Sequence, residues 1–287
     1  MFEPLIGAQE IFETSYPEMQ FLLGPNLLPK SGRMLLTAEN GTGKSAIALY
    51  TSVCTILGLP WFGFTNSHKA EDFGKPSFPI MGGNKVLYVD YEVPQAIRRS
   101  LRLQPLVNKF GTAFLQNLSF ARMPTHFRLE AGPAFDRLLK IVEEFKPDVI
   151  VIDPLSSSHS EEENSSRMRV PLNHIDRLID ASGAAAIVIH HATTKKSRNQ
   201  SGEVITRGAK EQSRGHSSIT DWADFNMLVT DKTAGQNRVK TLELTFAKTR
   251  YSHKRQKRYI LADIGGMTFE PAPVSPTSKL LNELGEE

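Results

Sequence analysis

The fold of this chain is decided by one short stretch of its sequence, Ala38-Glu39-Asn40-Gly41-Thr42-Gly43-Lys44-Ser45. The last three residues complete the phosphate-loop pattern, in which a glycine and four free positions precede Gly-Lys-Ser or Gly-Lys-Thr. An apolar strand is expected before the stretch, at residues 33–37, and a helix after it, at residues 45–57. Because this strand-loop-helix context is the one that the motif requires, the stretch predicts a nucleoside triphosphate site.

Such a loop binds phosphates mainly through backbone N–H groups at the start of a helix. The residues that we expect to bind the nucleotide are Asn40, Gly41, Thr42, Gly43, Lys44 and Ser45. Lys44 would neutralise the outer phosphates, and Ser45 would bind magnesium. Ala38 replaces the first glycine of the pattern, which affects only the turn that leaves the strand. The expected cofactors are therefore ATP and Mg²⁺.

Two further carboxylates are expected at the ends of apolar strands. Asp153 ends a strand at residues 149–153, about a hundred residues after Lys44, where a P-loop enzyme holds magnesium through water. Glu92 follows a strand at residues 85–90, which we expect beside the phosphate loop. A carboxylate in that place is suited to orient the attacking water, so Glu92 is the candidate general base. Asp90, two residues earlier, is the alternative base.

The strand expected at residues 185–190 ends in two histidines, His190 and His191. A polar side chain at this position can lie near the γ-phosphate and signal its loss to neighbouring loops, and we assign that role to His190. The alternative is a histidine that only makes a hydrogen bond at the end of a strand. A metal site at this pair would need further ligands at suitable spacing.

Apolar runs alternate with amphipathic stretches of helical length, a pattern typical of βαβ units. Strands are expected at residues 33–37, 85–90, 118–121, 149–153 and 185–190, and helices at residues 45–57, 95–110, 134–145 and 168–182. After about residue 222 the pattern predicts only strands, at residues 225–230, 239–246 and 258–261. We therefore expect an α/β fold with a mainly parallel sheet flanked by helices and a C-terminal antiparallel β extension. Residues 1–270 would form one domain, followed by a weakly ordered acidic tail at residues 271–287.

The composition is that of an ordinary globular protein: 287 residues, 40% hydrophobic and 23% charged. The single cysteine, Cys54, excludes a disulfide within the chain and is expected in the core. No stretch approaches the roughly 18 consecutive apolar residues of a membrane span, so we expect a soluble, cytoplasmic protein. The net charge of +3 is too small to indicate a nucleic-acid partner by itself.

Between residues 27 and 259 the chain resembles the RepA-type hexameric helicases of plasmids, which are related to the replicative helicases of bacteria. The resemblance rests on the phosphate loop, on Asp153-Pro154-Leu155 with the following His159-Ser160-Glu161-Glu162-Glu163-Asn164, on His190-His191, and on Ser213-Arg214-Gly215-His216-Ser217-Ser218. It implies a RecA-like P-loop core and a ring-shaped homo-oligomer, as a hexamer.

A further match is Ala247-Lys248-Thr249-Arg250-Tyr251, which resembles the Ala-Lys-x-Arg element of bacterial replicative helicases. The resemblance implies that Lys248 and Arg250 act across a subunit interface, where a cation from the neighbour stabilises charge on the γ-phosphate. Arg207, in the preceding loop, competes for this role. The alternative is an exposed strand that carries alternate charges.

A basic loop is expected at residues 192–214, which carry six basic residues against two acids. The loop follows the histidine pair and suits contact with the phosphates of single-stranded DNA, with Lys195, Lys196 and Arg198 as candidate DNA-binding residues. A charged surface loop without a ligand is the alternative. The basic residues at 254–258 form a second candidate.

Together these features favour an ATP-driven DNA helicase or translocase that acts as a ring on single-stranded DNA in replication, in a mobile element. The alternative is a RecA-like ATPase that serves as a nucleotide-controlled DNA-binding or regulatory module without unwinding activity. A P-loop kinase of small molecules ranks third, since no arginine-rich substrate lid is visible. The sequence identifies no primase or loading partner.

Overall fold

The computed structural model describes residues 6–15, 18–24, 26–64, 80–124, 127–130, 132–161, 165–192, 197–198, 204–205, 217–233, 239–252 and 258–271. For residues 197–198, 204–205 and 258 it describes the backbone alone. None of the helices in these ranges is long and apolar enough to cross a membrane.

A nine-stranded sheet forms the centre of the molecule, in the order β13-β12-β11-β10-β3-β7-β6-β4-β5. Six of its strands run parallel: β3 (Arg33–Ala38), β4 (Val86–Asp90), β5 (Leu118–Arg122), β6 (Val149–Asp153), β7 (Ala185–His191) and β10 (Phe225–Asp231). Three strands continue the sheet in antiparallel fashion: β11 (Thr241–Thr249), β12 (Arg258–Asp263) and β13 (Phe269–Pro271). The predicted fold class, a mainly parallel sheet with a C-terminal antiparallel extension, is confirmed.

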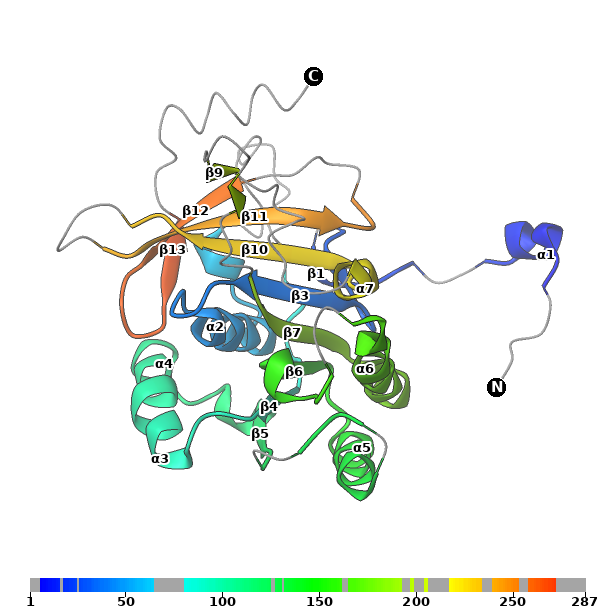
Figure 1. The fold of residues 1–287 in the computed structure, drawn as a ribbon, viewed down its shortest axis with the longest axis horizontal. Coiled ribbons are helices and arrows are strands. Elements are labelled where there is room, and N and C mark those ends of the chain that lie inside the picture. The colour runs from blue at the N-terminus through cyan, green and yellow to red at the C-terminus, as the bar shows by residue number, and fades with distance from the viewer. Residues whose placement is uncertain are drawn as a thin grey trace.

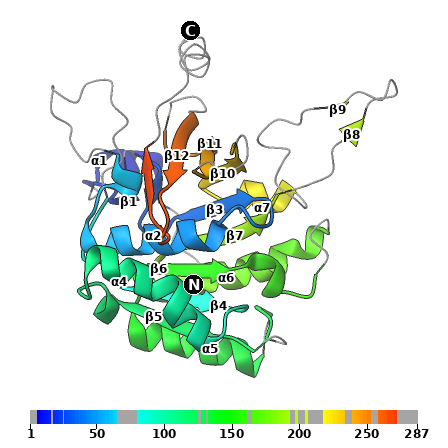
Figure 2. The same ribbon diagram turned by 90° about the vertical axis from the view of Figure 1, so that its left-hand side faces the viewer.

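Helices cover both faces of the parallel strands (Figures 1 and 2). One face packs against α2 (Lys44–Leu57) and against a helical segment made of α3 (Gln95–Ile97), the π-helical turn η3 (Arg98–Leu103) and α4 (Gln104–Phe110). The other face packs against α5 (Pro133–Phe145), α6 (Arg169–Ser182) and the short α7 (Ser217–Trp222). Because side chains alternate along a strand, β3, β4, β6 and β7 each supply both cores.

The two cores follow this alternation in β3. Met34, Leu36 and Ala38 join the α2 face, whereas Leu35 joins the face of α5 and α6. Cys54 of α2 is buried in the first core, which confirms its predicted place.

Smaller elements lie outside the main sheet. β1 (Phe21–Leu23) and β2 (Leu28–Pro29) form an antiparallel pair, and short 3-10 turns occur at η1 (Trp61–Gly63), η4 (Leu115–Asn117), η5 (Leu155–Ser157) and η6 (Ser166–Met168). All six residues of α1 (Ala8–Glu13) are exposed, and Figure 1 shows this helix far from the sheet.

The predicted elements are found with shifts of at most three residues at their ends, and three differences matter. The helix predicted at residues 95–110 contains a π-helical turn in its middle. The loop predicted at residues 192–214 includes two short paired strands, β8 (Ser197–Arg198) and β9 (Val204–Ile205). The strand that precedes Glu92, β4, does not lie beside β3, because β7 and β6 separate them.

Candidate nucleotide site

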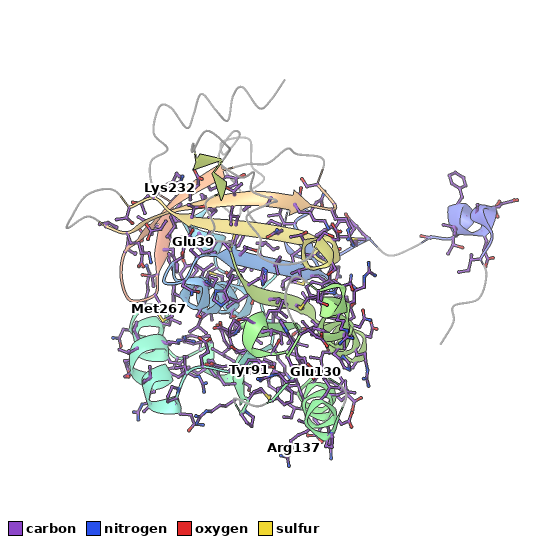
Figure 3. The ribbon with its side chains drawn as sticks, viewed as in Figure 1. Glu39, Tyr91, Glu130, Arg137, Lys232 and Met267 are labelled. Carbon is purple, nitrogen blue, oxygen red and sulfur yellow. The ribbon has the colours of Figure 1, made fainter. Side chains whose placement is uncertain are left out.

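The phosphate loop joins β3 to α2 at the carboxyl edge of the parallel strands. Figure 3 labels Glu39, the residue that follows β3. Gly41 and Gly43 have φ angles of 76° and 103°, in the left-handed region that glycine adopts without steric cost. α2 then begins at Lys44, and within the described residues no side chain caps its N-terminus. Its first N–H groups are therefore available for an anion.

Lys44 lies folded back over the loop. Its side chain is 8% exposed, and its Nζ donates hydrogen bonds to the carbonyl oxygens of Ala38 at 2.9 Å and Glu39 at 2.8 Å. Burial lowers the pKa of Lys44, while the carboxylates of Asp153, Glu92 and Glu39 oppose this shift. An ammonium group has three N–H donors, so a third remains to reach a phosphate.

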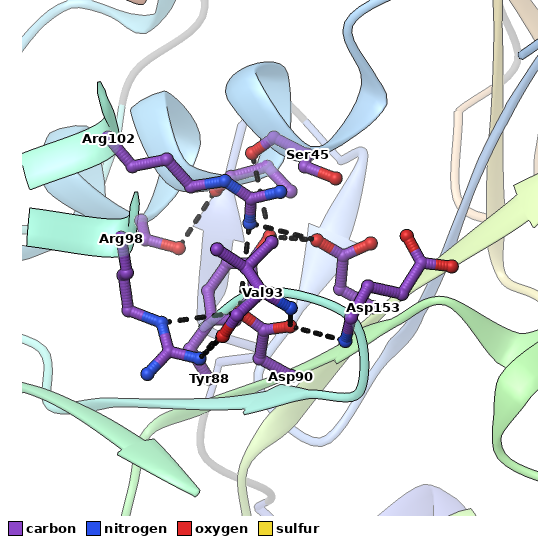
Figure 4. A network of polar contacts seen from close by, with 10 residues as sticks. Ser45, Tyr88, Asp90, Val93, Arg98, Arg102 and Asp153 are labelled. Carbon is purple, nitrogen blue, oxygen red and sulfur yellow. Dashed lines mark hydrogen bonds and ion pairs between the residues drawn. The ribbon is translucent and has the colours of Figure 1, made fainter. Parts of the chain in front are cut away.

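Ser45 and Asp153 meet at the same edge (Figure 4). Asp153 is 4% exposed; the Tyr88 hydroxyl donates to its Oδ2 at 2.6 Å, and the Ser45 side chain lies close enough to favour the ionised carboxylate. Burial raises the pKa of Asp153, and the hydrogen bonds from Tyr88 and Ser45 work in the opposite direction.

This pair of oxygen ligands fits a magnesium ion. Mg²⁺ prefers oxygen ligands and is commonly held by one or two protein groups together with water and substrate phosphates. Among the described residues no group of three or more His, Cys, Asp or Glu could hold a metal. Ser45 and Asp153 are therefore the protein groups that would hold magnesium, with nucleotide and water supplying the remaining ligands.

Asp90 and Glu92, the two candidate bases, differ in their surroundings. Asp90 is 1% exposed, and its Oδ1 accepts hydrogen bonds from the backbone N–H groups of Glu92 at 2.9 Å and Val93 at 3.0 Å. Its Oδ2 accepts from Arg98 Nη2 at 2.8 Å and Nε at 3.2 Å. These four bonds give Asp90 a structural task, and the geometry favours Glu92 as the base.

Glu92 is exposed but stands close to the other charged groups of the site. Partial burial and then the carboxylates of Asp153 and Asp90 raise its pKa, whereas Arg102 and a hydrogen bond from Ser157 lower it. Although β4 is not adjacent to β3, Asp90 pairs in register with Asp153 of β6. The carboxyl ends of β4 and β6 therefore lie side by side. A raised pKa brings a carboxylate closer to the pKa that general base catalysis needs near neutral pH.

His190 is fully buried at the end of β7, in register with Thr37 of β3. The Thr37 hydroxyl donates to Asn226 Oδ1 at 3.2 Å, and both residues are buried. Alternation along β7 places His190 on the face of α5 and α6, and places His191, opposite Ala38, on the face of α2. The register therefore favours His191 over His190 as the residue on the side of the phosphate loop.

Lys248 and Arg250 lie at the amino-terminal ends of the parallel strands, opposite the phosphate loop. Lys248 Nζ donates to the carbonyl oxygens of Thr220 at 3.0 Å and Asp221 at 2.8 Å, at the end of α7. Arg250 Nη2 donates to the Asp221 carbonyl at 3.1 Å, and its Nη1 lies 2.6 Å from Asp224 Oδ1. Both cations point away from the phosphate loop of their own chain.

Other predicted residues lie outside the described part of the chain. These are Lys195, Lys196, Arg207, the side chain of Arg198, residues 162–164, residues 213–216 and the side chains at 254–258. Their roles stay predictions.

The sequence interpretation missed four side chains of this region: Tyr88, Arg98, Arg102 and Lys240. Arg98 and Arg102 are four residues apart in a helix that follows Glu92, a spacing that places both on one face and could have revealed them. Lys240 Nζ donates to the Gly41 carbonyl at 2.8 Å and lies 3.9 Å from Asp231 Oδ2, and no local motif indicates this contact.

Comparisons with known proteins bear on the family and the fold of the chain. A family model described as an AAA domain matches residues 8–197. Circadian clock protein KaiC2 of Synechocystis sp. is 28% identical over 183 residues, which cover 60% of this chain and 25% of that protein. The chain thus spans about a quarter of the length of this curated relative. Among solved structures, a KaiC-like protein from Pyrococcus horikoshii OT3 has a TM-score of 0.53 at 17% identity, covering 85% of this chain and 91% of that one, which supports the fold.

Proposed function

Since this chain belongs to the AAA domain family, we propose that it hydrolyses ATP at the phosphate loop and works as a ring of subunits on single-stranded DNA. One observation carries the proposal of hydrolysis. Lys44, Ser45, Asp153 and Glu92 come from three separate parts of the sequence and face one another at one edge of the sheet. These are the groups that phosphate binding, metal binding and activation of water require.

In the proposed reaction the loop N–H groups and Lys44 hold the β- and γ-phosphates, which fixes the γ-phosphorus for in-line attack. Magnesium, when bound with the nucleotide, supplies charge neutralisation between these phosphates. The Glu92 carboxylate accepts a hydrogen bond from the attacking water and takes its proton. Tyr88 keeps the Asp153 carboxylate in place through its hydrogen bond.

The proposal of a ring rests on Lys248 and Arg250. Both side chains are tied to α7 at the other edge of the sheet, so they have no route to their own phosphate loop without a rearrangement. A neighbouring subunit would bring its loop to them, and their charge would then stabilise the transition state in trans. Hydrolysis would in this way depend on how the subunits are arranged.

The proposed contact with DNA rests on the basic sequence at 192–214, including Lys195, Lys196 and Arg198. A second candidate function is a nucleotide-controlled regulatory module without unwinding activity. The likeness to KaiC2, a protein named for the circadian clock, is the observation that supports this second function.

The test begins with ATP hydrolysis by the purified chain, with and without single-stranded DNA, and with Lys44→Ala as the inactive control. We expect DNA to stimulate hydrolysis and the mass of the assembly to be that of a ring when a nonhydrolysable ATP analogue is added. A forked duplex then separates the two functions: unwinding supports the helicase, and DNA-stimulated hydrolysis without unwinding supports the regulatory module. Hydrolysis that ignores DNA would contradict both, and no hydrolysis would contradict the proposed reaction itself.

A further inference from the structure

Arg102 projects from the π-helical turn η3 toward the two buried carboxylates of the site (Figure 4). Its Nη1 lies 3.7 Å from Asp90 Oδ2 and 3.8 Å from Asp153 Oδ2, and its side chain is 17% exposed. Within the described part of the chain this buried nitrogen has no hydrogen-bond partner. Arg102 is therefore held at the carboxylates by charge rather than by directional bonds.

Arg98, one turn earlier, is held quite differently. It makes two hydrogen bonds to Asp90, a third to the Val93 carbonyl at 2.9 Å, and its guanidinium lies 4.6 Å from the centre of the Phe120 ring. Together with the backbone N–H groups of Glu92 and Val93, Arg98 already satisfies Asp90. Arg102 is thus a second cation that Asp90 does not need, and its Nη1 lies almost as close to Asp153 as to Asp90.

The charges explain what such a cation can do. Asp90 and Asp153 carry two negative charges, and Arg98 and Arg102 carry two positive charges, so these four side chains balance one another. Lys44 and Glu92 add one charge of each sign beside them, which leaves the balance unchanged. A magnesium ion held by Ser45 and Asp153 would add positive charge beside Arg102. Because its contacts are too long to be hydrogen bonds, the guanidinium can move away without breaking one.

We propose that Arg102 is a positioning residue that neutralises Asp153 in place of magnesium and competes with the metal ion for this carboxylate. The inference rests on the proposed nucleotide site. In the absence of magnesium, Arg102 lowers the electrostatic cost of bringing nucleotide phosphates next to Asp153. When magnesium binds, Arg102 withdraws from the carboxylate. The helical segment 95–110, to which Arg102 belongs, then loses a contact with the site and its dynamics change.

The test measures binding of a fluorescent ADP by the full chain, first in EDTA and then during a titration with Mg²⁺. For Arg102→Met we expect binding in EDTA to weaken about tenfold and the Mg²⁺ concentration at half-saturation to fall by a similar factor. The affinity for nucleotide in EDTA would thus fall while the apparent affinity for Mg²⁺ rises. A general loss of structure would lower both affinities. Arg99→Met is the matched control, since Arg99 is exposed on the same turn, and it should change neither value.

Arg102→Lys separates charge from shape. Because the contacts are not directional, an ammonium group should replace the guanidinium, and both values should stay within about threefold of those of the unmodified protein. Hydrogen exchange of residues 95–110 should respond to magnesium in the unmodified protein and respond much less in Arg102→Met.

Four outcomes overturn the inference. If Arg102→Met lowers the affinity for nucleotide and the affinity for Mg²⁺ equally, or changes neither affinity, Arg102 does not compete with the metal ion. A loss in Arg102→Lys as large as that in Arg102→Met would show that charge is not the cause. If the unmodified protein binds no nucleotide, the proposed function fails and the role of Arg102 fails with it.

Discussion

At each end of the parallel strands an aspartate is buried beside two arginines, and the arginines differ in their exposure. At the phosphate-loop edge, Asp90 is paired with Arg98 and Arg102, whose side chains are only 5% and 17% exposed. At the opposite edge, Asp224 is paired with Arg33 and Arg250, whose side chains are 29% and 42% exposed. The chemistry is the same, but solvent reaches the second pair of cations much more than the first.

This difference in exposure indicates which molecule each group of arginines can act on. Arg98 and Arg102 are enclosed by their own chain, so they act on carboxylates of their own site. Arg250 stabilises Asp224 while part of its guanidinium remains at the surface, where a second molecule can meet it. A closed charge cluster suits a function within the chain, and an open one suits a function between chains.

The largest expected effect tests the open edge. Arg250→Met should lower ATP hydrolysis by about a thousandfold, since a finger residue contributes this much to phosphoryl transfer, while nucleotide binding is kept. Mixing Arg250→Met with Lys44→Ala subunits should restore part of the activity, because each variant supplies what the other lacks. Arg33→Met, which removes the other partner of Asp224, should leave hydrolysis near normal. Normal hydrolysis by Arg250→Met would show that Arg250 does not act on the site of a neighbouring subunit.

A somewhat smaller effect is expected from Glu92→Gln at the closed edge. Loss of the general base should slow turnover by roughly a hundredfold to ten-thousandfold while nucleotide affinity changes little. Glu39→Gln is the matched control, because Glu39 also faces Lys44 yet lies on the loop itself. If both variants lose the same fraction of activity, Glu92 has no special role and the assignment to it is wrong.

Stability should separate the two edges as well. Arg98→Met leaves a buried carboxylate with its strongest partner removed and should lower the free energy of unfolding by about 3–5 kcal/mol. Arg33→Met removes a partly exposed cation and should cost about 1 kcal/mol. Urea denaturation of both variants measures the difference, and equal losses would show that depth of burial does not distinguish the edges.

The smallest effect concerns pH. Glu92 acts as a base only when ionised, and its pKa is raised, so hydrolysis should decline as the pH falls through this raised value, at a higher pH than for an ordinary glutamate. The hydrogen bond from Ser157 lowers this pKa, so Ser157→Ala should move the acid limb of the pH–rate profile to higher pH. A limb that stays in place would show that another group titrates there.

Local interactions made much of the fold predictable. The phosphate loop depends on Gly41 and Gly43 for its positive φ angles and on the strand and helix that flank it, all within a short stretch. The parallel strands were visible as apolar runs because both of their faces are buried. The apolar strands also predicted that Asp153 and Glu92 would lie at the carboxyl ends of parallel strands. The prediction that the strand before Glu92 lies beside the phosphate loop was wrong, because β7 and β6 separate β4 from β3.

The sequence by itself therefore determined the phosphate loop, the class of the fold and the carboxylates at its edge. Only the tertiary structure decided the order of the strands, the face on which each histidine lies, and which cations reach which carboxylates. Tyr88 meets Asp153 across 65 residues of sequence, and Lys240 meets Gly41 across 199. Such contacts leave no periodic or local signal, because they arise only when packing of the two cores brings distant segments to the same edge of the sheet.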